Sequence, residues 1–247
     1  SWMYYADRLM ELPSGVLGVA LGTILLPALS KTHASADRVE YSRLLDWGLR
    51  LCFLLVLPCS LALALLAEPL TVALFQYGKF NGHDALMTQH ALIAYSVGLL
   101  GIILIKVLAP GFYAMQNIRT PVRIAVVTLV STQLMNLVFV GPLQHAGLAL
   151  AISLGACLNA GLLFYNLHKQ QIFDPEKGWR VFLTKIGLAC VVMGSAIWLV
   201  SPHDVWWQTG AVWLKVSWLV GLIVLALTSY FATLRLLGMP FKQMLGR

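Results

Sequence analysis

Charged residues are scarce in this chain. Only 11% of its 247 residues are Asp, Glu, Lys or Arg, and 59% are hydrophobic, whereas soluble globular domains carry about 25% charged residues. So few polar side chains cannot coat a soluble fold of this length. The composition therefore excludes a water-soluble domain and indicates a protein whose solvent is the lipid bilayer.

Motifs of known enzyme classes are also lacking. The chain has no HExxH, no GxSxG and no glycine-rich phosphate loop, and its six histidines lie scattered, without the spacing of metal ligands. We therefore expect no enzymatic activity, no metal site and no cofactor. The cysteines form no CxxC pair, and we interpret them as small buried hydrophobes. They are Cys52, Cys59, Cys157 and Cys190.

Linkers and low-complexity tracts are missing as well, so nothing marks a separate soluble domain. Seven stretches approach the roughly 20 apolar residues that a membrane-spanning helix needs. They cover about 2–30, 44–66, 85–110, 121–141, 145–167, 181–200 and 212–234. The sequence therefore predicts an all-α, polytopic membrane helix bundle with seven transmembrane helices.

The longest polar break in the second half, residues 168–180, predicts a division of this bundle. We expect residues 1–168 to form one lobe of five spans, and residues 169–247 to add two spans and a short tail. The chain starts at Ser1 inside an apolar helical pattern, without a signal peptide. We therefore expect it to be a piece of a longer protein.

The basic residues predict the orientation. The net charge of +7 comes from short clusters between apolar runs, which is typical of membrane topology rather than of nucleic-acid binding. One set of helix ends holds most of them, and the other, around 67–84, 142–144 and 201–215, holds Lys79 and Lys215. The positive-inside rule therefore places the first set, and the C-terminus, in the cytoplasm. This set is Lys31, Arg38, Arg43, Arg50, Arg119, Arg123, Lys169, Lys177, Arg180, Lys185, Arg235, Lys242 and Arg247.

A charged cluster opens the first apolar stretch. Asp7 and Glu11 share a helix face, and Arg8 lies one turn from Glu11. Ionisable groups inside a bilayer usually face a polar cavity, which favours Arg8 as an anchor for an anionic substrate, held by the two carboxylates. The alternative is an arginine that snorkels to the outer interface, because Arg8 lies 22 residues before Ser30.

Further polar residues interrupt the other spans. Lys106 lies just before Pro110, and we interpret it either as snorkelling toward the cytoplasm or as a substrate-binding or gating residue. Gly18 and Gly22 form a GxxxG pair that favours close helix packing. Three amides in the fourth and fifth spans are expected to make hydrogen bonds between helices. They are Gln133, Asn136 and Asn159.

Several segments together resemble the MurJ (MviN) family of lipid II flippases. The match is carried, in the expected order, by residues 2–11 (WMYYADRLME), 13–18 (PSGVLG), 25–27 (LLP), 75–80 (FQYGKF), 106–114 (KVLAPGFYA) and 120–122 (TPV). They cover roughly residues 1–168. The last two spans match by position and hydropathy more than by motif.

The resemblance implies a second lobe of a transporter of the multidrug/oligosaccharidyl-lipid/polysaccharide exporter superfamily, starting at the eighth of fourteen helices. Its substrate would be lipid II, an undecaprenyl pyrophosphate carrying a disaccharide-pentapeptide, moved across the bacterial inner membrane by alternating access. An essential cavity arginine of the family falls on Arg8, and acidic positions fall on Asp7 and Glu11. The two last spans would form a lipid-facing groove for the prenyl tail.

The same resemblance implies binding partners, and two alternative functions stay open. The partners would be lipid II, membrane lipids, the N-terminal lobe of the same protein and possible cell-wall synthases, with no nucleic acid. One rival is another exporter of the superfamily that carries polysaccharide-linked lipids or drugs. The other is a non-transporting membrane scaffold for cell-wall synthases.

Overall fold

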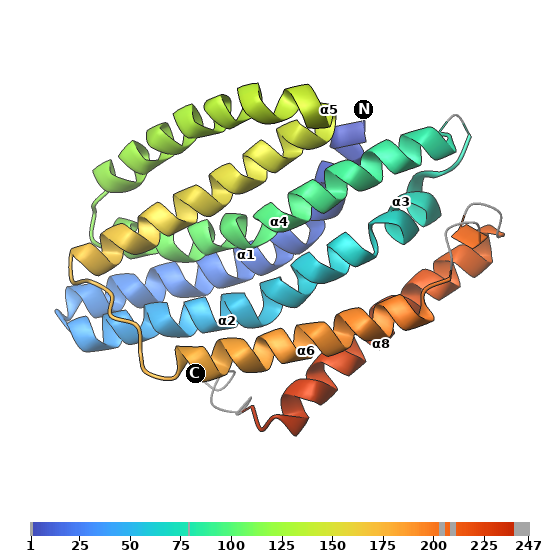
Figure 1. Cartoon of the computed structure of the whole chain (residues 1–247). Helices are drawn as coiled ribbons and strands as arrows, with labels where there is room; N and C mark the ends of the chain where they lie inside the picture. Colours follow the sequence, from blue (N-terminus) through green and yellow to red (C-terminus); the bar gives the residue numbers. More distant parts are fainter. Residues whose placement is uncertain (1, 79, 203–205, 208–210, 240–247) are drawn as a thin grey trace.

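The structure is a computed structural model that describes residues 2–78, 80–202, 206–207 and 211–239. Three basic residues used to predict the orientation, Lys79, Lys242 and Arg247, lie outside the described residues. Within the described ranges the chain is all-helical, which confirms the predicted fold class. The elements are α1 (Trp2–Ala34), α2 (Arg38–Leu65), α3 (Ala67–Phe75), α4 (Gly82–Tyr113), α5 (Arg119–Lys169), α6 (Trp179–Val200) and α8 (Val212–Leu236) (Figure 1).

The helix α5 accounts for two predicted spans. Six described helices are long and apolar enough to cross a membrane, and α5, with 51 residues, is the longest. It folds back at Gln144, whose φ of 49° and ψ of −126° are not helical, so that a first arm (residues 119–143) and a second arm (residues 145–169) lie side by side (Figure 1). A Cβ at Gly147 would collide with the Phe139 carbonyl, so glycine lets the two arms meet closely at this bend.

The short helix α3 was not predicted. The pattern of residues 67–84 predicts a connection between two spans. The chain instead continues from α2, through a break at Leu66 (φ −94°, ψ 12°), into a further helix of nine residues. Pro69 lies in the first turn of α3, where a missing N–H costs no helical hydrogen bond. The sequence signal was therefore a proline at a position that the first turn of a helix tolerates.

Capping residues explain where two of the long helices begin. Asp37 accepts a hydrogen bond from the Glu40 N–H at 3.0 Å, so α2 begins at Arg38, earlier than the predicted 44. Asn81 and Asp84 form a reciprocal capping box at the start of α4, with both bonds at 3.0 Å.

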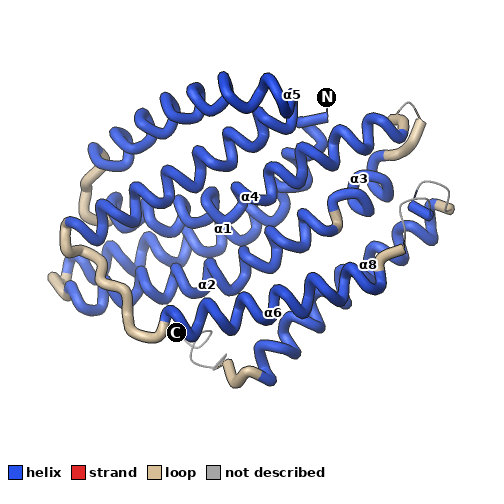
Figure 2. Tube along the Cα trace, viewed as in Figure 1, coloured by secondary structure: helices blue, strands red, loops and turns tan. Residues whose placement is uncertain are grey.

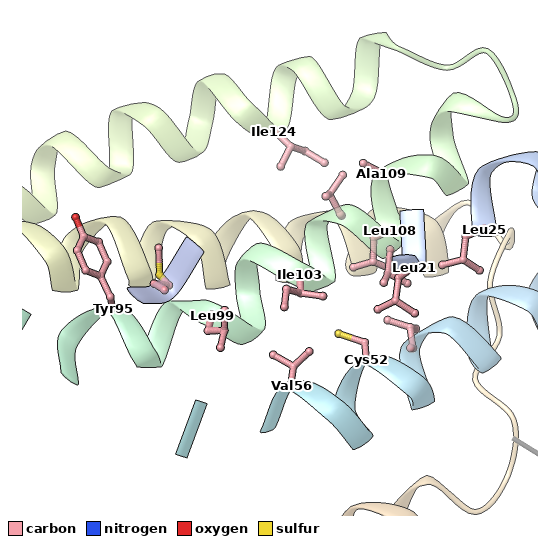
Figure 3. Close-up of a cluster of buried hydrophobic side chains, with 14 of the residues drawn as sticks. Leu21, Leu25, Cys52, Val56, Tyr95, Leu99, Ile103, Leu108, Ala109 and Ile124 are labelled. Atoms are coloured by element: carbon pink, nitrogen blue, oxygen red, sulfur yellow. The ribbon is translucent and has the colours of Figure 1, made fainter. Parts of the chain in front are cut away.

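The helices pack around two hydrophobic clusters that share α2. The first lies among α1, α2, α4 and α5, and includes Leu25, Cys52 and Leu99, all without exposed surface (Figure 3). The second lies among α2, α3, α6 and α8 and includes Ile186 and Leu222. Helix α4 is at the centre of the bundle. In its most apolar stretch of 18 residues, 61% is buried, whereas the share is 22–39% in the corresponding stretches of the other long helices.

The loops gather at the two ends of the bundle (Figure 2). We call the end where α1 and α4 finish and α2 and α6 begin the basic end, since it carries Lys31, Arg38 and Arg180. The opposite end holds the starts of α1 and α4 and the bend of α5.

Candidate functional site

The charged cluster lies on an outward face of α1. The Nη1 atom of Arg8 is 2.5 Å from Oε2 of Glu11, and both side chains are more than half exposed, at 55% and 59%. The guanidinium also lies over the Tyr4 ring, 5.0 Å from its centroid. An exposed arginine with one carboxylate partner can exchange that partner for a phosphate oxygen without first breaking a buried network.

Asp7 does not hold Arg8, contrary to the predicted pair of carboxylates. Among the described residues Arg8 has one ion pair, and it is with Glu11. Asp7 is exposed and interacts electrostatically with Tyr95 of α4 instead. The reason is rotation about the helix, since neighbouring residues point about 100° apart and do not face each other.

The rest of this face of α1 is apolar and exposed. Leu12, Val16 and Val19 are 72%, 65% and 61% exposed, whereas Met10, Leu21 and Leu25 on the other face are packed against the bundle. The first arm of α5 is likewise exposed over Val126, Leu129 and further residues along its length. Charged groups at one end of a long apolar face are suited to a substrate that has a charged head and a hydrocarbon tail.

Lys106 contacts α1. Its Nζ atom donates a hydrogen bond to the Ser14 carbonyl at 3.0 Å, and its side chain fills the space beside Gly18. The Lys106 carbonyl lies level with Gly22, so the side chain extends away from the basic end toward Ser14. The side chain therefore does not snorkel toward the basic end, which is the end that the sequence predicts to be cytoplasmic. Helical side chains tilt toward the helix N-terminus, which here is the opposite end.

Gly18 has a different role from the one predicted. A Cβ at Gly18 would lie 2.7 Å from the Lys106 Nζ atom and would also clash with its Cδ atom. A Cβ at Gly22 would meet only the Lys106 carbonyl, at 3.9 Å. Gly22 therefore allows ordinary helix packing, whereas Gly18 leaves a notch for a charged side chain.

The predicted interhelical amide bonds are not formed. Asn136 donates to Gln133 within the first arm of α5, at 3.5 Å, which is a weak bond along one helix. The Asn159 side chain is half-buried and makes no hydrogen bond to any residue that the structure describes.

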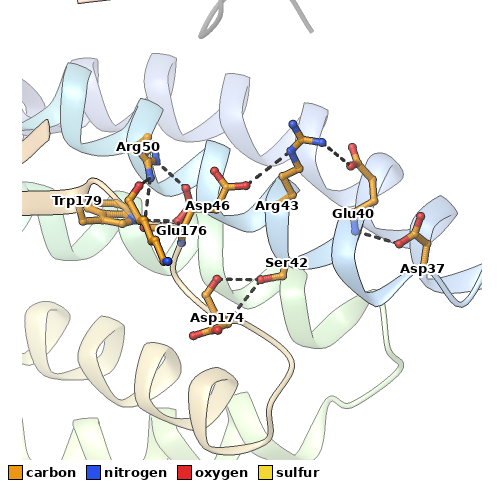
Figure 4. Close-up of polar contacts among 10 residues, drawn as sticks. Asp37, Glu40, Ser42, Arg43, Asp46, Arg50, Asp174, Glu176 and Trp179 are labelled. Atoms are coloured by element: carbon orange, nitrogen blue, oxygen red, sulfur yellow. Dashed lines mark hydrogen bonds and ion pairs between the residues drawn. The ribbon is translucent and has the colours of Figure 1, made fainter.

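A buried carboxylate near the basic end was missed by the sequence reasoning. Asp46 is 1% exposed and accepts hydrogen bonds from Arg50 Nε at 2.6 Å, Trp179 Nε1 at 2.7 Å and the Glu176 N–H at 3.1 Å (Figure 4). Arg50 also lies 5.2 Å from the Trp179 ring centroid. These bonds attach the connection between α5 and α6 to α2. The only sequence signal was the Asp46–Arg50 spacing of four residues inside an apolar run.

A second contact at the opposite end was also missed. Trp2 Nε1 donates to Asp84 Oδ1 at 2.7 Å, and the Trp2 ring lies 5.3 Å from the ring of His145. His145 is itself within 2.8 Å of the Met87 carbonyl. The start of α1, the start of α4 and the bend of α5 are thus tied together.

A groove of about 540 Å³ opens between α2, α4, the second arm of α5 and α6. Its lining is almost wholly apolar and includes Phe53, Leu104, Phe164 and Leu183. The side chains of α6 line one wall, and the others belong to the core helices. Such a surface suits hydrocarbon chains and holds no charged group in its lining.

Comparisons with known proteins give the relatives of this chain. Among curated proteins it is 52% identical, over 243 residues, to the "Lipid II flippase MurJ" of Burkholderia cenocepacia, a match that covers 98% of this chain and 47% of that protein. It is 40% identical, over 253 residues, to the "Probable lipid II flippase MurJ" of Haemophilus influenzae, which covers 100% and 49%. The chain thus spans about half the length of these curated relatives.

The fold agrees with these matches. A solved structure named "Lipid II flippase MurJ, inward closed conformation" superposes with a TM-score of 0.77 at 25% identity, covering 100% of this chain and 48% of that one. A family model described as "Lipid II flippase MurJ" matches residues 1–217. Since that match includes most of the sequence and all of α1 to α6, the chain belongs to the lipid II flippase MurJ family.

Proposed function

We propose that this chain is the C-terminal half of a lipid II flippase of the bacterial inner membrane, and that Arg8 binds the pyrophosphate of the head group. The head group enters a cationic cavity between two lobes from the cytoplasm, the prenyl tail stays in lipid, and rocking of the lobes exposes the head group outside. The relatives named as lipid II flippases support this proposal.

One observation carries the residue assignment. Arg8 is a permanently charged group on an apolar helix, it is 55% exposed, and its one ion-pair partner among the described residues is Glu11, which is 59% exposed. A guanidinium binds two phosphate oxygens at once and does not lose its proton, so it can hold a pyrophosphate in an apolar setting. Glu11 would hold Arg8 when the cavity is empty, and Asp7 would set the charge around it.

Lys106 was also predicted as a substrate-binding or gating residue. A direct contact with substrate stays a prediction, and the bond from its ammonium to Ser14 favours a different role.

The arrangement of the whole chain is part of the proposal. Residues 1–168 form the lobe, and residues 169–247 are appended to it, which agrees with the two hydrophobic clusters that meet at α2. The basic end faces the cytoplasm, and the N-terminal lobe lies opposite the exposed faces of α1 and the first arm of α5, with the cavity between the lobes. Membrane lipids cover the remaining apolar surface, and synthases would dock at the loops.

The test uses cells depleted of their own flippase and supplied with the full-length protein. We expect the intact protein to restore lipid II exposure on the outer face. Arg8→Ala should lower the exposure rate by about tenfold or more, because hydrogen bonds to charged groups contribute roughly 1.5 to 3 kcal/mol. Arg123→Ala is the matched control, since it removes an exposed arginine of α5 outside the cluster and should leave transport unchanged.

Membrane accumulation is measured for every variant. Loss of accumulation in Arg8→Ala would mean that the arginine is structural. If the intact, inserted protein restores no exposure, the chain belongs to a scaffold or to an exporter of another lipid. If neutralising the charged cluster has no effect on lipid II exposure, while substitutions in the loops abolish growth, the scaffold function is favoured over transport.

A further inference from the structure

The segment of α1 that carries the charged cluster is held by α4 at both of its ends. At its start, Trp2 donates to Asp84 at 2.7 Å. At its other end, Lys106 donates to the Ser14 carbonyl at 3.0 Å. Arg8 lies between these two contacts, on the side of α1 that faces away from the core.

Pro13 makes the second contact important. It lies inside α1 and has no N–H, so the helix lacks the hydrogen bond that would normally join residues 9 and 13. Helices bend most easily at such a position. The turn that follows Pro13 starts with Ser14, whose carbonyl is the acceptor for Lys106. Lys106 therefore binds α1 next to one of its two internal prolines, the other being Pro27.

The contact is shaped for a lysine. Gly18 leaves a notch in which the Lys106 stem lies, since a Cβ there would come within 3.0 Å of its Cε atom and 2.7 Å of its Nζ atom. Placing an ammonium group in an apolar helix bundle costs free energy unless it finds a polar partner. An isosteric apolar side chain could fill the same notch, but it could not bond to the Ser14 carbonyl.

We propose that Lys106 is a positioning residue, which locks α1 at Pro13 and so sets the angle at which the cluster of Arg8 and Glu11 meets the substrate. The proposal rests on the proposed function of Arg8, and it differs from direct binding of the head group by Lys106. Release of the lysine would let the segment of α1 between Trp2 and Pro13 bow away from α4 or turn about its own axis, while Trp2 still tethers its tip.

The first experiment measures flipping by the full-length protein in the depleted cells. Lys106→Met removes the bond and keeps the packing, and Gly18→Ala pushes the flexible lysine out of its notch, since the three atoms nearest to the added Cβ all belong to the Lys106 side chain. Each should lower the rate by at least about threefold, because each removes one bond to a charged group. Gly22→Ala is the matched control on the same helix and should transport normally, because its Cβ makes only an ordinary contact at 3.9 Å.

The double variant tests whether Lys106 and Gly18 act through one contact. Both substitutions break the same contact, so Lys106→Met combined with Gly18→Ala should be no worse than either alone. Multiplying effects would mean that the two residues act independently and would overturn the proposal.

The second experiment measures geometry and does not depend on activity. Spin labels are placed at Leu12 and Val97, both exposed, in full-length protein without other cysteines. The distance distribution between them should shift or broaden in Lys106→Met and in Gly18→Ala, but not in Gly22→Ala. A control pair of labels is placed at Ile24, which follows Pro13 on α1, and at Val97 on α4. The distance between these two labels should stay unchanged in all variants.

The outcomes are distinct. Unchanged Leu12–Val97 distances in Lys106→Met, together with lost flipping, would overturn the proposal and make Lys106 a substrate ligand. If Arg8→Ala flips normally, the proposed function of the cluster fails, whatever the distances show. Changed distances with normal flipping in both variants would overturn the link between the angle of α1 and transport.

Discussion

Asp46 and the residues that bind it determine how α6 is attached to the core. The carboxylate is 1% exposed and accepts three hydrogen bonds, two of which come from the connection before α6 and its first residue. A buried charge that loses its partners costs far more than an exposed one, because water cannot replace them. The same connection is also held by Ser42, which bonds to the backbone of Asp174 in both directions.

We therefore predict that Asp46→Ala destabilises the protein by roughly 3 to 5 kcal/mol, since it leaves the Arg50 Nε–H and the Trp179 Nε1–H without their acceptor. Thermal unfolding of the purified full-length protein measures this change. Arg43→Gln is the control, because Arg43 is 54% exposed and its contacts with Glu40 and Glu176 are 3.8 Å and 3.6 Å long. It should change stability by no more than about 1 kcal/mol. Equal effects of the two variants would contradict this account.

At the scale of the elements, glycines set the distance between α4 and α5. A Cβ at Gly98 would lie 2.5 Å from the Ser153 Cα atom, and one at Gly101 would lie 2.6 Å from the Cys157 backbone nitrogen. These are backbone atoms, so no side chain can move aside. In lipid, where no hydrophobic effect drives helices together, such close approach is a main source of packing energy.

Gly101→Ala should therefore destabilise the protein by about 1 to 3 kcal/mol, because α4 and α5 must separate to accept the methyl group. The measurement is the unfolding temperature, with Gly187→Ala as the control. Gly187 lies in α6 with no atom within 4 Å of its Cβ position, and alanine there improves helix propensity. If Gly101→Ala unfolds at the same temperature as Gly187→Ala, α4 and α5 do not approach each other as closely as these distances indicate.

At the scale of the whole molecule, the ends of the bundle differ in charge. Described basic residues gather where α1 ends and α6 begins, whereas the opposite end carries Trp2, Trp206 and Trp207. The positive-inside rule then predicts that the basic end faces the cytoplasm.

Reporter fusions to the full-length protein test this orientation. Green fluorescent protein fused after Arg247 should fluoresce, because it folds in the cytoplasm, and alkaline phosphatase fused there should be inactive. Alkaline phosphatase fused after Pro202, between α6 and α8, should be active. The reverse pattern would invert the proposed direction of transport, from the cytoplasm outward.

The sequence by itself determined the features that the bilayer imposes locally. Each span must be a long apolar helix, since every backbone group in lipid needs an internal hydrogen bond. The long apolar helices, including both arms of α5, and the cluster of Arg8 and Glu11 could therefore be predicted from runs of neighbouring residues. The family followed from motifs of the same local kind.

Only the tertiary structure decided which polar groups meet across the helices. Lys106 and Ser14 are 92 residues apart, Asp46 and Trp179 are 133 apart, and Trp2 and Asp84 are 82 apart. No local pattern encodes such pairs, because each depends on how the helices rotate and slide against one another as they pack. The lysine was misread for that reason: its partner is the backbone of another helix, at a position that Gly18 leaves open.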